Sequence, residues 1–522
     1  MAVRLKEYLR VNFKTIIIAF FCVVLAYGFF LFNPTVSIDE ETWLLNGTQP
    51  LGWLEQGRIA IHIFDLIFSH NGAPIPFLWD FFAILTWFSS GLIFLFIFAE
   101  ELPELKVFAK IVFLVYYATI PFVAGDMMAF SMSSFPVATG LLATAFSVGN
   151  TRIWLKTKSK VNLIWAIVLL FYGISIYQAI LGLYITAIVG LCFIRVLNRE
   201  FKTFEMVWKS AMIAIISTVA YFIVFFSIVT IRGSYDSYIT EGFIGWWSGE
   251  SVFLTLFKAL YNICRVSFGS PFLGAESVFG GTVICILTIA YICYAIFTFF
   301  TIKEMKEKAQ FLFYAIMFAC GPFIMYVLMG TNNTMGRMLF GLCLTGALQM
   351  VLILNATEQH RRLHQVVIVM VIYLLFLNLS NMNRIYFNDY IRYQYDCTVG
   401  NEIMLEIEKS GYDYHSKPVV FIGAKQPDAI AMDQHDTLGM KGSYFLWDDG
   451  NNGRISGFLK TLGYTVLPSS TDQKQGAVNA SQMMATWPNE GSIIEKDGVI
   501  IVKLSEPSQK WYHANGIQQK LQ

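Results

Sequence analysis

The sequence has little charge. Only 14% of its 522 residues are Asp, Glu, Lys or Arg, against roughly 25% in a soluble domain. Its net charge is +1, and no block of Lys and Arg has the pattern of a nucleic-acid-binding surface. Hydrophobic residues make up 56%, and the mean hydropathy is +0.56. The composition excludes a soluble globular domain and indicates a polytopic membrane protein, and we expect no nucleic-acid partner.

Cysteine motifs are also missing. The eight cysteines lie mostly inside apolar segments, with no C-x-x-C and no Cys/His cluster, so neither a zinc site nor a disulfide framework is supported. No small-residue cleavage site follows the first apolar run, which therefore reads as an uncleaved helix. Internal repeats with paired broken helices are absent as well, which disfavours a transporter.

Apolar stretches of membrane-spanning length recur down to Ser380. They predict about eleven transmembrane helices, at 15–32, 77–99, 107–123, 130–149, 161–178, 180–197, 209–231, 279–300, 309–329, 338–355 and 365–380. Lys and Arg concentrate in alternate loops, which predicts a cytoplasmic N-terminus. The first loop and everything after Ser380 then face the outside.

The predicted architecture is a transmembrane domain, residues 1–380, followed by a small extracytoplasmic α/β domain, 381–510, and a tail, 511–522. Two external loops, 33–76 and 232–278, are expected to carry the site. Each contains an amphipathic segment, 57–70 and 253–268, which we expect to lie in the membrane interface. In the C-terminal domain the pattern predicts a strand at 419–422, a hairpin over 492–504 and helices at 401–409 and 457–462.

The most unusual stretch is Ser37-Ile38-Asp39-Glu40-Glu41, at the mouth of the first predicted helix. Three carboxylates at a membrane boundary are costly unless they are paired or used. A carboxylate with neighbouring acids can take a proton from a sugar hydroxyl. We therefore predict Asp39 and Glu40 as catalytic residues; the alternative is that they are ordinary solvated loop acids.

Two external arginines, Arg58 and Arg337, are candidates for binding a phosphate. Arg337 precedes a helix, and a guanidinium beside a helix N-terminus suits a phosphate. The alternative is that both arginines contact lipid headgroups.

Aromatic and polar residues on the same predicted face are candidates for binding sugar. Trp53, Tyr177 and Trp246 could stack on sugar rings, although an interfacial aromatic belt is the simpler explanation for each. Gln56 and Gln178 could hydrogen-bond a ligand or serve helix packing. Asp126 could pair with Asp39, as metal ligands or sharing a proton, although capping a helix or lining water is the simpler explanation.

The acidic loop followed by Trp53…Gln56-Gly57-Arg58 resembles the bacterial serotype-converting, O-antigen-type glucosyltransferases, membrane enzymes of the GT-C class. The resemblance extends to Asn383–Asp389 and to Pro418–Gly423. It implies a polyprenyl-phosphate-sugar donor, usually undecaprenyl-phosphate-glucose, used on the outer face of the bacterial cytoplasmic membrane. The acceptor would be a cell-envelope glycan such as O-antigen, teichoic acid or wall polysaccharide.

The resemblance also implies roles for particular residues. The first-loop acid, here Asp39 with Glu40, would be the general base of an inverting transfer, and Arg58 or Arg337 would bind the donor phosphate. No cofactor is implied with certainty, and a divalent cation, Mg²⁺ or Mn²⁺, stays open. A donor-synthesising glycosyltransferase and a flippase are the functional partners that fit.

Two other functions remain as alternatives. A lipid-linked-glycan transporter or flippase needs a polar path through the bilayer, yet the predicted spans hold few ionisable residues. An O-antigen polymerase or ligase would be an enzyme with a different donor linkage.

Overall fold

The computed structural model describes residues 2–46, 50–68, 75–102, 105–200, 203–233, 244–247, 249–272, 278–330, 335–427 and 442–517. The chain divides into two compact units. Unit 1 comprises Met1–Phe32, Pro50–His70 and Ile75–Arg384. Unit 2 comprises Asn33–Gln49, Asn71–Pro74 and Ile385–Gln522. The acidic stretch of the first loop is therefore part of unit 2, together with the C-terminal segment.

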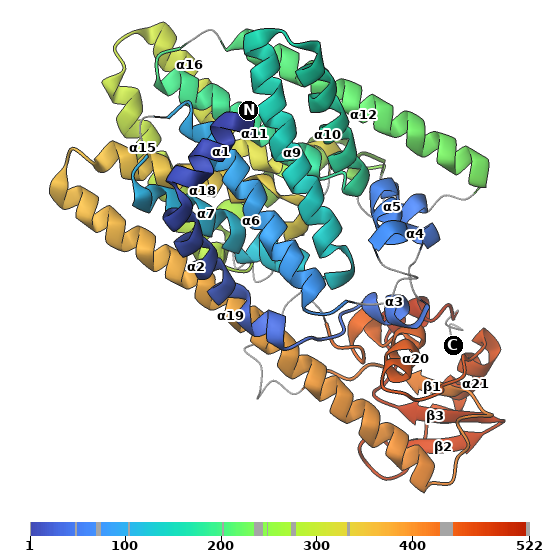
Figure 1. Ribbon diagram of the computed structural model, residues 1–522. Coiled ribbons are helices and arrows are strands. Elements are labelled where there is room, and N and C mark those ends of the chain that lie inside the picture. The colour runs from blue at the N-terminus through green and yellow to red at the C-terminus, as the bar shows by residue number, and fades with distance from the viewer. Residues whose placement is uncertain are drawn as a thin grey trace. The chain divides into compact units, whose positions relative to one another are not determined.

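Unit 1 is helical, because a backbone in lipid must satisfy its hydrogen bonds within each segment (Figure 1). Its helices are α1 (Ala2–Val11), α2 (Phe13–Phe32), α4 (Pro50–Glu55), α5 (Ile59–Phe68), α6 (Leu78–Ala99), α7 (Val107–Thr119), η2 (Pro121–Gly125), α8 (Asp126–Met128), α9 (Ser131–Thr157), α10 (Lys160–Ile176), α11 (Ile180–Leu197), α12 (Phe204–Arg232), η3 (Gly245–Trp247), α14 (Val252–Phe272), α15 (Gly281–Thr301), α16 (Met305–Cys320), η4 (Gly321–Phe323), α17 (Ile324–Met329), η5 (Gly336–Met338), α18 (Gly341–Thr357) and the start of α19 (Arg361–Lys409).

Among the described residues, ten helices are long and apolar enough to cross a membrane, which confirms the polytopic helical class. Nine of them coincide with predicted spans. The predicted spans 161–178 and 338–355 form α10 and α18, shorter apolar helices of 17 residues each. The tenth candidate is Val252–Gly269, where we predicted an interfacial helix. Its mean hydropathy of 1.2 is the lowest of the ten, because polar residues recur among the apolar ones in its amphipathic pattern.

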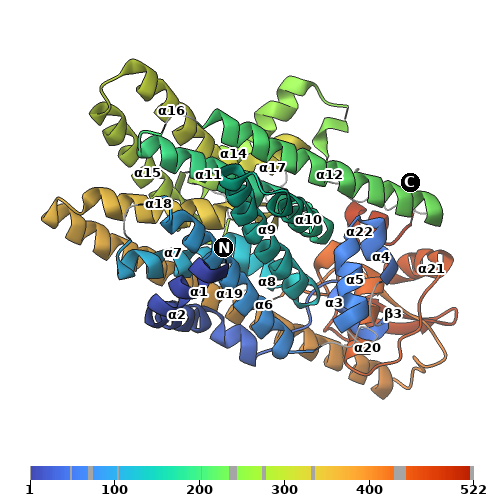
Figure 2. The ribbon, with the colours of Figure 1, turned by 45° about the horizontal axis from the view of Figure 1, so that its top comes forward.

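Helix α9 packs against both α6 and α10, and α18 packs against α7 (Figure 2). Glycines permit the close approach of these helices. A Cβ on Gly173 of α10 would lie 2.7 Å from the Thr144 hydroxyl of α9. A Cβ on Gly346 of α18 would lie 2.2 Å from the Tyr116 ring of α7.

The connection between α7 and α9 is an irregular, buried segment. Pro121 lacks an amide N–H and cannot continue the ladder of α7, and the chain takes a π-helical turn, Pro121–Gly125, before the short α8. This break places Asp126 at a kink within the bundle. The η5 turn packs directly against the π-helical turn, because a Cβ on Gly336 would be 1.5 Å from the Phe122 carbonyl oxygen.

Unit 2 contains α3 (Glu40–Asn46), the second half of α19, β1 (Val419–Ile422), η7 (Trp447–Asp449), α20 (Asn452–Thr461), α21 (Thr471–Ser481), β2 (Ile493–Lys496), β3 (Val499–Lys503) and α22 (Gln509–Ala514). The sheet order is β1-β3-β2, with β1 parallel and β2 antiparallel to β3. The predicted strand and hairpin are therefore confirmed, and so is a helix at 401–409.

Both faces of this sheet are covered. Val419 and Phe421 belong to one apolar cluster, with Ile403 of α19 and Phe458 of α20. The alternate strand residues, Val420 and Ile422, belong to a second cluster with α21 and α22, as expected from the two-residue period of a strand. Trp511 is fully buried in the second cluster. Residues 511–517 thus belong to the packed unit, contrary to the predicted tail from residue 511.

Helix α19 is too long for a membrane alone. Its 49 residues correspond to about 73 Å at ~1.5 Å per residue, more than twice the ~30 Å hydrocarbon thickness. Its apolar run ends near Ser380, and polar and charged residues such as Asp389, Arg392 and Asp396 follow. We therefore take the second half of α19, which belongs to unit 2, as lying outside the membrane-spanning part.

Candidate functional site

The Gln56-Gly57-Arg58 turn is held by two polar side chains of unit 1. The Gln178 amide donates to the Gln56 carbonyl (3.0 Å) and to the Tyr221 hydroxyl (2.8 Å). The Tyr221 hydroxyl donates to the Gly57 carbonyl (3.1 Å). Gly57 has φ +74°, and a Cβ there would lie 2.2 Å from the Tyr221 oxygen. Only glycine fits this left-handed, crowded position without strain.

Arg58 lies between two aromatic rings. Its guanidinium carbon is 5.1 Å from the ring centroid of Trp53 and 5.1 Å from that of Tyr177, within the range of cation–π attraction. The Trp53 indole N–H donates to the buried Asp65 carboxylate at 3.0 Å. We call Arg58, Trp53, Tyr177 and Gln178 the Arg58 cage. One face of each ring is occupied by the guanidinium, so at most the other face is left for a sugar.

The second predicted arginine, Arg337, is paired with Asp126. The Arg337 guanidinium lies 3.2 Å from Asp126 Oδ1, and the Arg337 backbone N–H donates to Oδ2 at 3.0 Å. The ring of Phe130 covers the guanidinium, with its centroid 4.8 Å away. Asp126 thus caps the η5 turn and neutralises part of the arginine's charge. Both of its oxygens are used in this way, as in the helix cap that the sequence offers as an alternative, and the acidic pair with Asp39 stays a prediction.

Trp246 fixes the end of a helix. Its indole N–H lies 3.1 Å from the Val327 carbonyl and 3.0 Å from that of Leu328, two of the carbonyls that the C-terminus of α17 leaves without helical partners. Stacking of Trp246 on a sugar stays a prediction. Parts of the two loops expected to carry the site, 47–49, 69–74, 234–243, 248 and 273–277, lie outside the described residues.

The acidic turn, residues 37–41, is a compact and largely buried element of unit 2. Ile38 belongs to the apolar cluster of α19 and α20. Glu40 is 3% exposed, and its carboxylate accepts the Ser37 backbone N–H at 2.8 Å. Asp39 has a left-handed backbone, φ 78°, which is uncommon outside glycine. Its side chain is 45% exposed, so Asp39 is the acid of this turn most open to a ligand.

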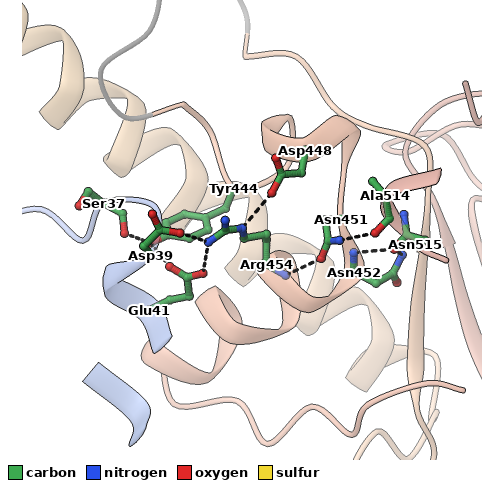
Figure 3. Close-up of polar contacts among 10 residues, drawn as sticks. All are labelled: Ser37, Asp39, Glu41, Tyr444, Asp448, Asn451, Asn452, Arg454, Ala514 and Asn515. Atoms are coloured by element: carbon green, nitrogen blue, oxygen red, sulfur yellow. Dashed lines mark hydrogen bonds and ion pairs between the residues drawn. The ribbon is translucent and has the colours of Figure 1, made fainter. Parts of the chain in front are cut away.

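A basic residue that the sequence analysis did not single out binds the turn. Arg454 Nη1 lies 2.6 Å from Asp39 Oδ1 and 3.0 Å from Glu41 Oε1 (Figure 3). Its Nε donates to Asp448 at 3.1 Å. No hydrogen bond joins Asp39 Oδ2 to any residue that the structure describes. Asp39 therefore presents one anchored oxygen and one oxygen available to a ligand.

Tyr444 closes the other side of the turn. Its hydroxyl lies 2.5 Å from the Ser37 carbonyl and 3.3 Å from Glu41 Oε2, and its ring stacks on Phe458. Burial raises the pKa of the Glu41 carboxyl, although the Arg454 charge acts in the opposite direction. Burial and then the Glu41 charge raise the pKa of the Tyr444 hydroxyl, so that it remains a hydrogen-bond donor.

The start of α20 positions Arg454. Asn451 caps this helix by accepting the Arg454 backbone N–H at 3.1 Å. The Asn452 side chain bonds both backbone groups of Phe421 in β1, at 2.7 and 2.8 Å, and its amide also donates to Asn515 (Figure 3). Asparagine before a helix is a recognised capping pattern, and it would have placed the helix start at 452 rather than at the predicted 457.

Among the described residues, no group of three or more His, Cys, Asp or Glu side chains is arranged to hold a metal ion. The carboxylates of Asp39, Glu41 and Asp448 converge instead on the Arg454 guanidinium. The described residues therefore provide no set of ligands for the divalent cation, whose presence the sequence does not decide.

Unit 2 contains a partly exposed carboxylate, and unit 1 contains two arginines that lie against aromatic rings. Neither curated proteins nor solved structures give a match to the chain. The family model described as glucosyl transferase GtrII matches residues 28–354, 327 of the 522 residues. The matched range contains the acidic turn, the Arg58 cage and Arg337, and it ends before Arg454. The chain therefore belongs to the GtrII glucosyl transferase family, which confirms the resemblance to serotype-converting glucosyltransferases.

Proposed function

We propose that this glucosyltransferase moves glucose from a polyprenyl-phosphate-glucose donor to a cell-envelope glycan, with inversion at the anomeric carbon and with Asp39 as the general base. The observation that carries the proposal is the Asp39 carboxylate: it is 45% exposed, held on one oxygen by Arg454, and open on the other. Its buried neighbours Glu40 and Glu41 are already bonded within unit 2. This favours Asp39 over Glu40, which then has the role of shaping the turn.

The proposed step is a single displacement. An acceptor hydroxyl oxygen attacks the anomeric carbon while Asp39 Oδ2 takes the hydroxyl proton. The bond between that carbon and the phosphate oxygen breaks, and polyprenyl phosphate leaves with the electron pair. Attack from the face opposite the leaving group inverts the anomeric centre. A positioned base of this kind contributes roughly 10²- to 10⁴-fold to a rate.

The two arginines are the proposed ligands of the donor phosphate. Arg58 suits this role best because its guanidinium lies against the Trp53 and Tyr177 rings, and a guanidinium held in place is a preorganised partner for a phosphate. Arg337 shares its charge with Asp126, so it would add direction more than net charge. Positive groups at the phosphate stabilise the charge that grows on the leaving group.

The proposed location is the bacterial cytoplasmic membrane, with the N-terminus in the cytoplasm and unit 2 outside. The support is the bias of Lys and Arg toward alternate loops and the apolar helices of unit 1. A donor made in the cytoplasm and used outside requires a donor-synthesising glycosyltransferase and a flippase, which are the proposed functional partners.

The test is glucosyl transfer by the purified full-length protein given polyprenyl-phosphate-glucose and an envelope glycan. We expect Asp39→Asn to lower turnover at least ~100-fold while the protein still binds the donor. Asp472→Asn, an exposed acid in the first turn of α21, is the matched control and should behave as wild type. Normal turnover in Asp39→Asn would remove the base. Transfer from a soluble nucleotide-glucose, with none from the lipid donor, would remove the donor class.

A further inference from the structure

One guanidinium in unit 2 gathers three carboxylates from two distant stretches of the sequence. Asp39 and Glu41 come from the acidic turn, and Asp448 comes from the loop before α20. Asp39 and Arg454 are 415 positions apart, and Arg454 lies outside the range matched by the family model. Figure 3 shows the Arg454 side chain extending toward Asp39 and Glu41, with Asp448 on its other edge.

We propose that Arg454 is a positioning residue for Asp39, which it holds with one oxygen anchored and the other directed to the acceptor hydroxyl. This inference rests on the proposed role of Asp39 as the general base. It assigns to the C-terminal segment a direct part in the geometry of the reaction.

The first support for this role is the strain in the turn. Asp39 has φ 78°, and a non-glycine residue in a sparsely populated region costs of order 1–3 kcal/mol unless its surroundings fix it. Ile38 is anchored in the apolar cluster on one side, and the Glu40 carboxylate caps the turn on the other. These two contacts hold the neighbours of Asp39, whereas the ion pair with Arg454, at 2.6 Å, holds the Asp39 side chain directly.

The second support is the charge balance. The charged and titratable groups that face Asp39 in unit 2 are Arg454 of α20, Glu40 and Glu41 of α3, Asp448 of η7 and Tyr444. Arg454 is the cation of this set. Without it, the carboxylates of Asp39 and Glu41 would repel each other, with no cation to hold the two together.

The third support is the rigidity of Arg454. Its backbone N–H is capped by Asn451, and Asn452 ties the helix start to β1 and to Asn515. Gly457, one turn further along α20, allows close contact with α3, because a Cβ there would lie 3.0 Å from Glu41 Cγ. Arg454 is thus delivered to the turn by a helix whose position is fixed by the sheet.

The experiment compares two variants of the full-length protein whose charge changes have opposite signs. Arg454→Gln removes the cation, so we expect kcat to fall roughly ten- to a hundredfold and the acidic limb of the pH–rate profile to move to higher pH. Asp448→Asn removes an anion from the same guanidinium, so the limb should move to lower pH. The donor KM should change by less than about twofold in both, since neither residue is assigned to the phosphate.

The controls separate this role from general stability. Arg454→Lys keeps the charge and should restore most of kcat and the position of the limb. Lys460→Gln, an exposed cation on the same helix, should change nothing. If Arg454→Gln does not fold, Asp448→Asn decides alone: its side chain is 46% exposed, and asparagine tolerates the left-handed backbone at this position.

A pH–rate profile that stays in place in both charge variants would overturn the inference. So would a loss of kcat in Arg454→Gln that the lysine variant does not recover. If Asp39→Asn is inactive while the Arg454 and Asp448 variants behave as wild type, only this inference fails. If Asp39→Asn is fully active, the proposed base fails first, and the role of Arg454 fails with it.

Discussion

Gly57→Ala tests whether the turn beside Arg58 must have its observed shape. A left-handed backbone costs alanine about 1–2 kcal/mol. The new methyl carbon would lie 2.2 Å from the Tyr221 oxygen, and overpacking of this kind costs about 1–3 kcal/mol. Loss of the hydrogen bond from Tyr221 to the Gly57 carbonyl adds about 1 kcal/mol. The sum is about 3–6 kcal/mol, concentrated at the residue that precedes Arg58.

We expect this strain to be relieved by movement of the turn, which displaces Arg58 from between Trp53 and Tyr177. The assay is binding of the polyprenyl-phosphate-glucose donor to the purified protein, followed by steady-state transfer. Donor affinity should fall at least tenfold, since ~1.4 kcal/mol corresponds to a factor of ten. Gly28→Ala is the matched control, because nothing lies within 4 Å of a Cβ at that glycine of α2.

A second variant isolates the steric part of the effect. Tyr221→Phe removes the oxygen that the new methyl group would strike, so the double variant Gly57→Ala/Tyr221→Phe should bind the donor better than Gly57→Ala alone. The expected coupling between the two sites is about 1–3 kcal/mol. Normal donor binding by Gly57→Ala, or a double variant no better than the single one, would refute the reasoning.

Two further substitutions test buried polar groups. Burial raises the pKa of Asp396 from 3.8 to about 7, so the contribution of the protonated Asp396 to the free energy of unfolding is complete below pH ~4 and is lost, at ~1.4 kcal/mol per pH unit, as the pH rises to about 7. Asp396→Asn should abolish this pH dependence, which hydrogen exchange of β1 and β3 in the full-length protein measures between pH 5 and 8. An unchanged pH dependence in the variant would contradict the prediction. Trp53→Phe keeps an aromatic ring beside Arg58 but removes the indole N–H that donates to Asp65. It should lower the free energy of unfolding by about 1–3 kcal/mol, and a thermal midpoint equal to that of wild type would show that this hydrogen bond contributes nothing.

The Arg58 cage was within reach of sequence reasoning. Trp53, Gln56 and Arg58 are neighbours on one short stretch, and Tyr177 and Gln178 stand together where a helix ends. Proximity in the sequence therefore carried most of the information about their proximity in space. The chemistry was less predictable, because a stacked guanidinium and an open sugar platform require the same residue types.

The partners of the acids were beyond sequence reasoning. Asp126 and Arg337 are 211 positions apart, and Asp39 and Arg454 are 415 apart. Composition and local patterns do not indicate which residues pair over such separations in the sequence. Hydropathy located the helices but left α14 ambiguous, since an apolar stripe of moderate strength fits both a spanning helix and one lying on the surface.

The discontinuous make-up of unit 2 has a consequence for biosynthesis. The Ser37 carbonyl and the Tyr444 hydroxyl that bonds it are 407 positions apart, and translation at roughly 5–20 residues per second needs about 20 to 80 seconds to cover that interval. For most of this time the acidic turn has left the ribosome, but β1, α20 and their asparagine anchors have not been made. The part of unit 2 that is made first must therefore be among the last to reach its final conformation.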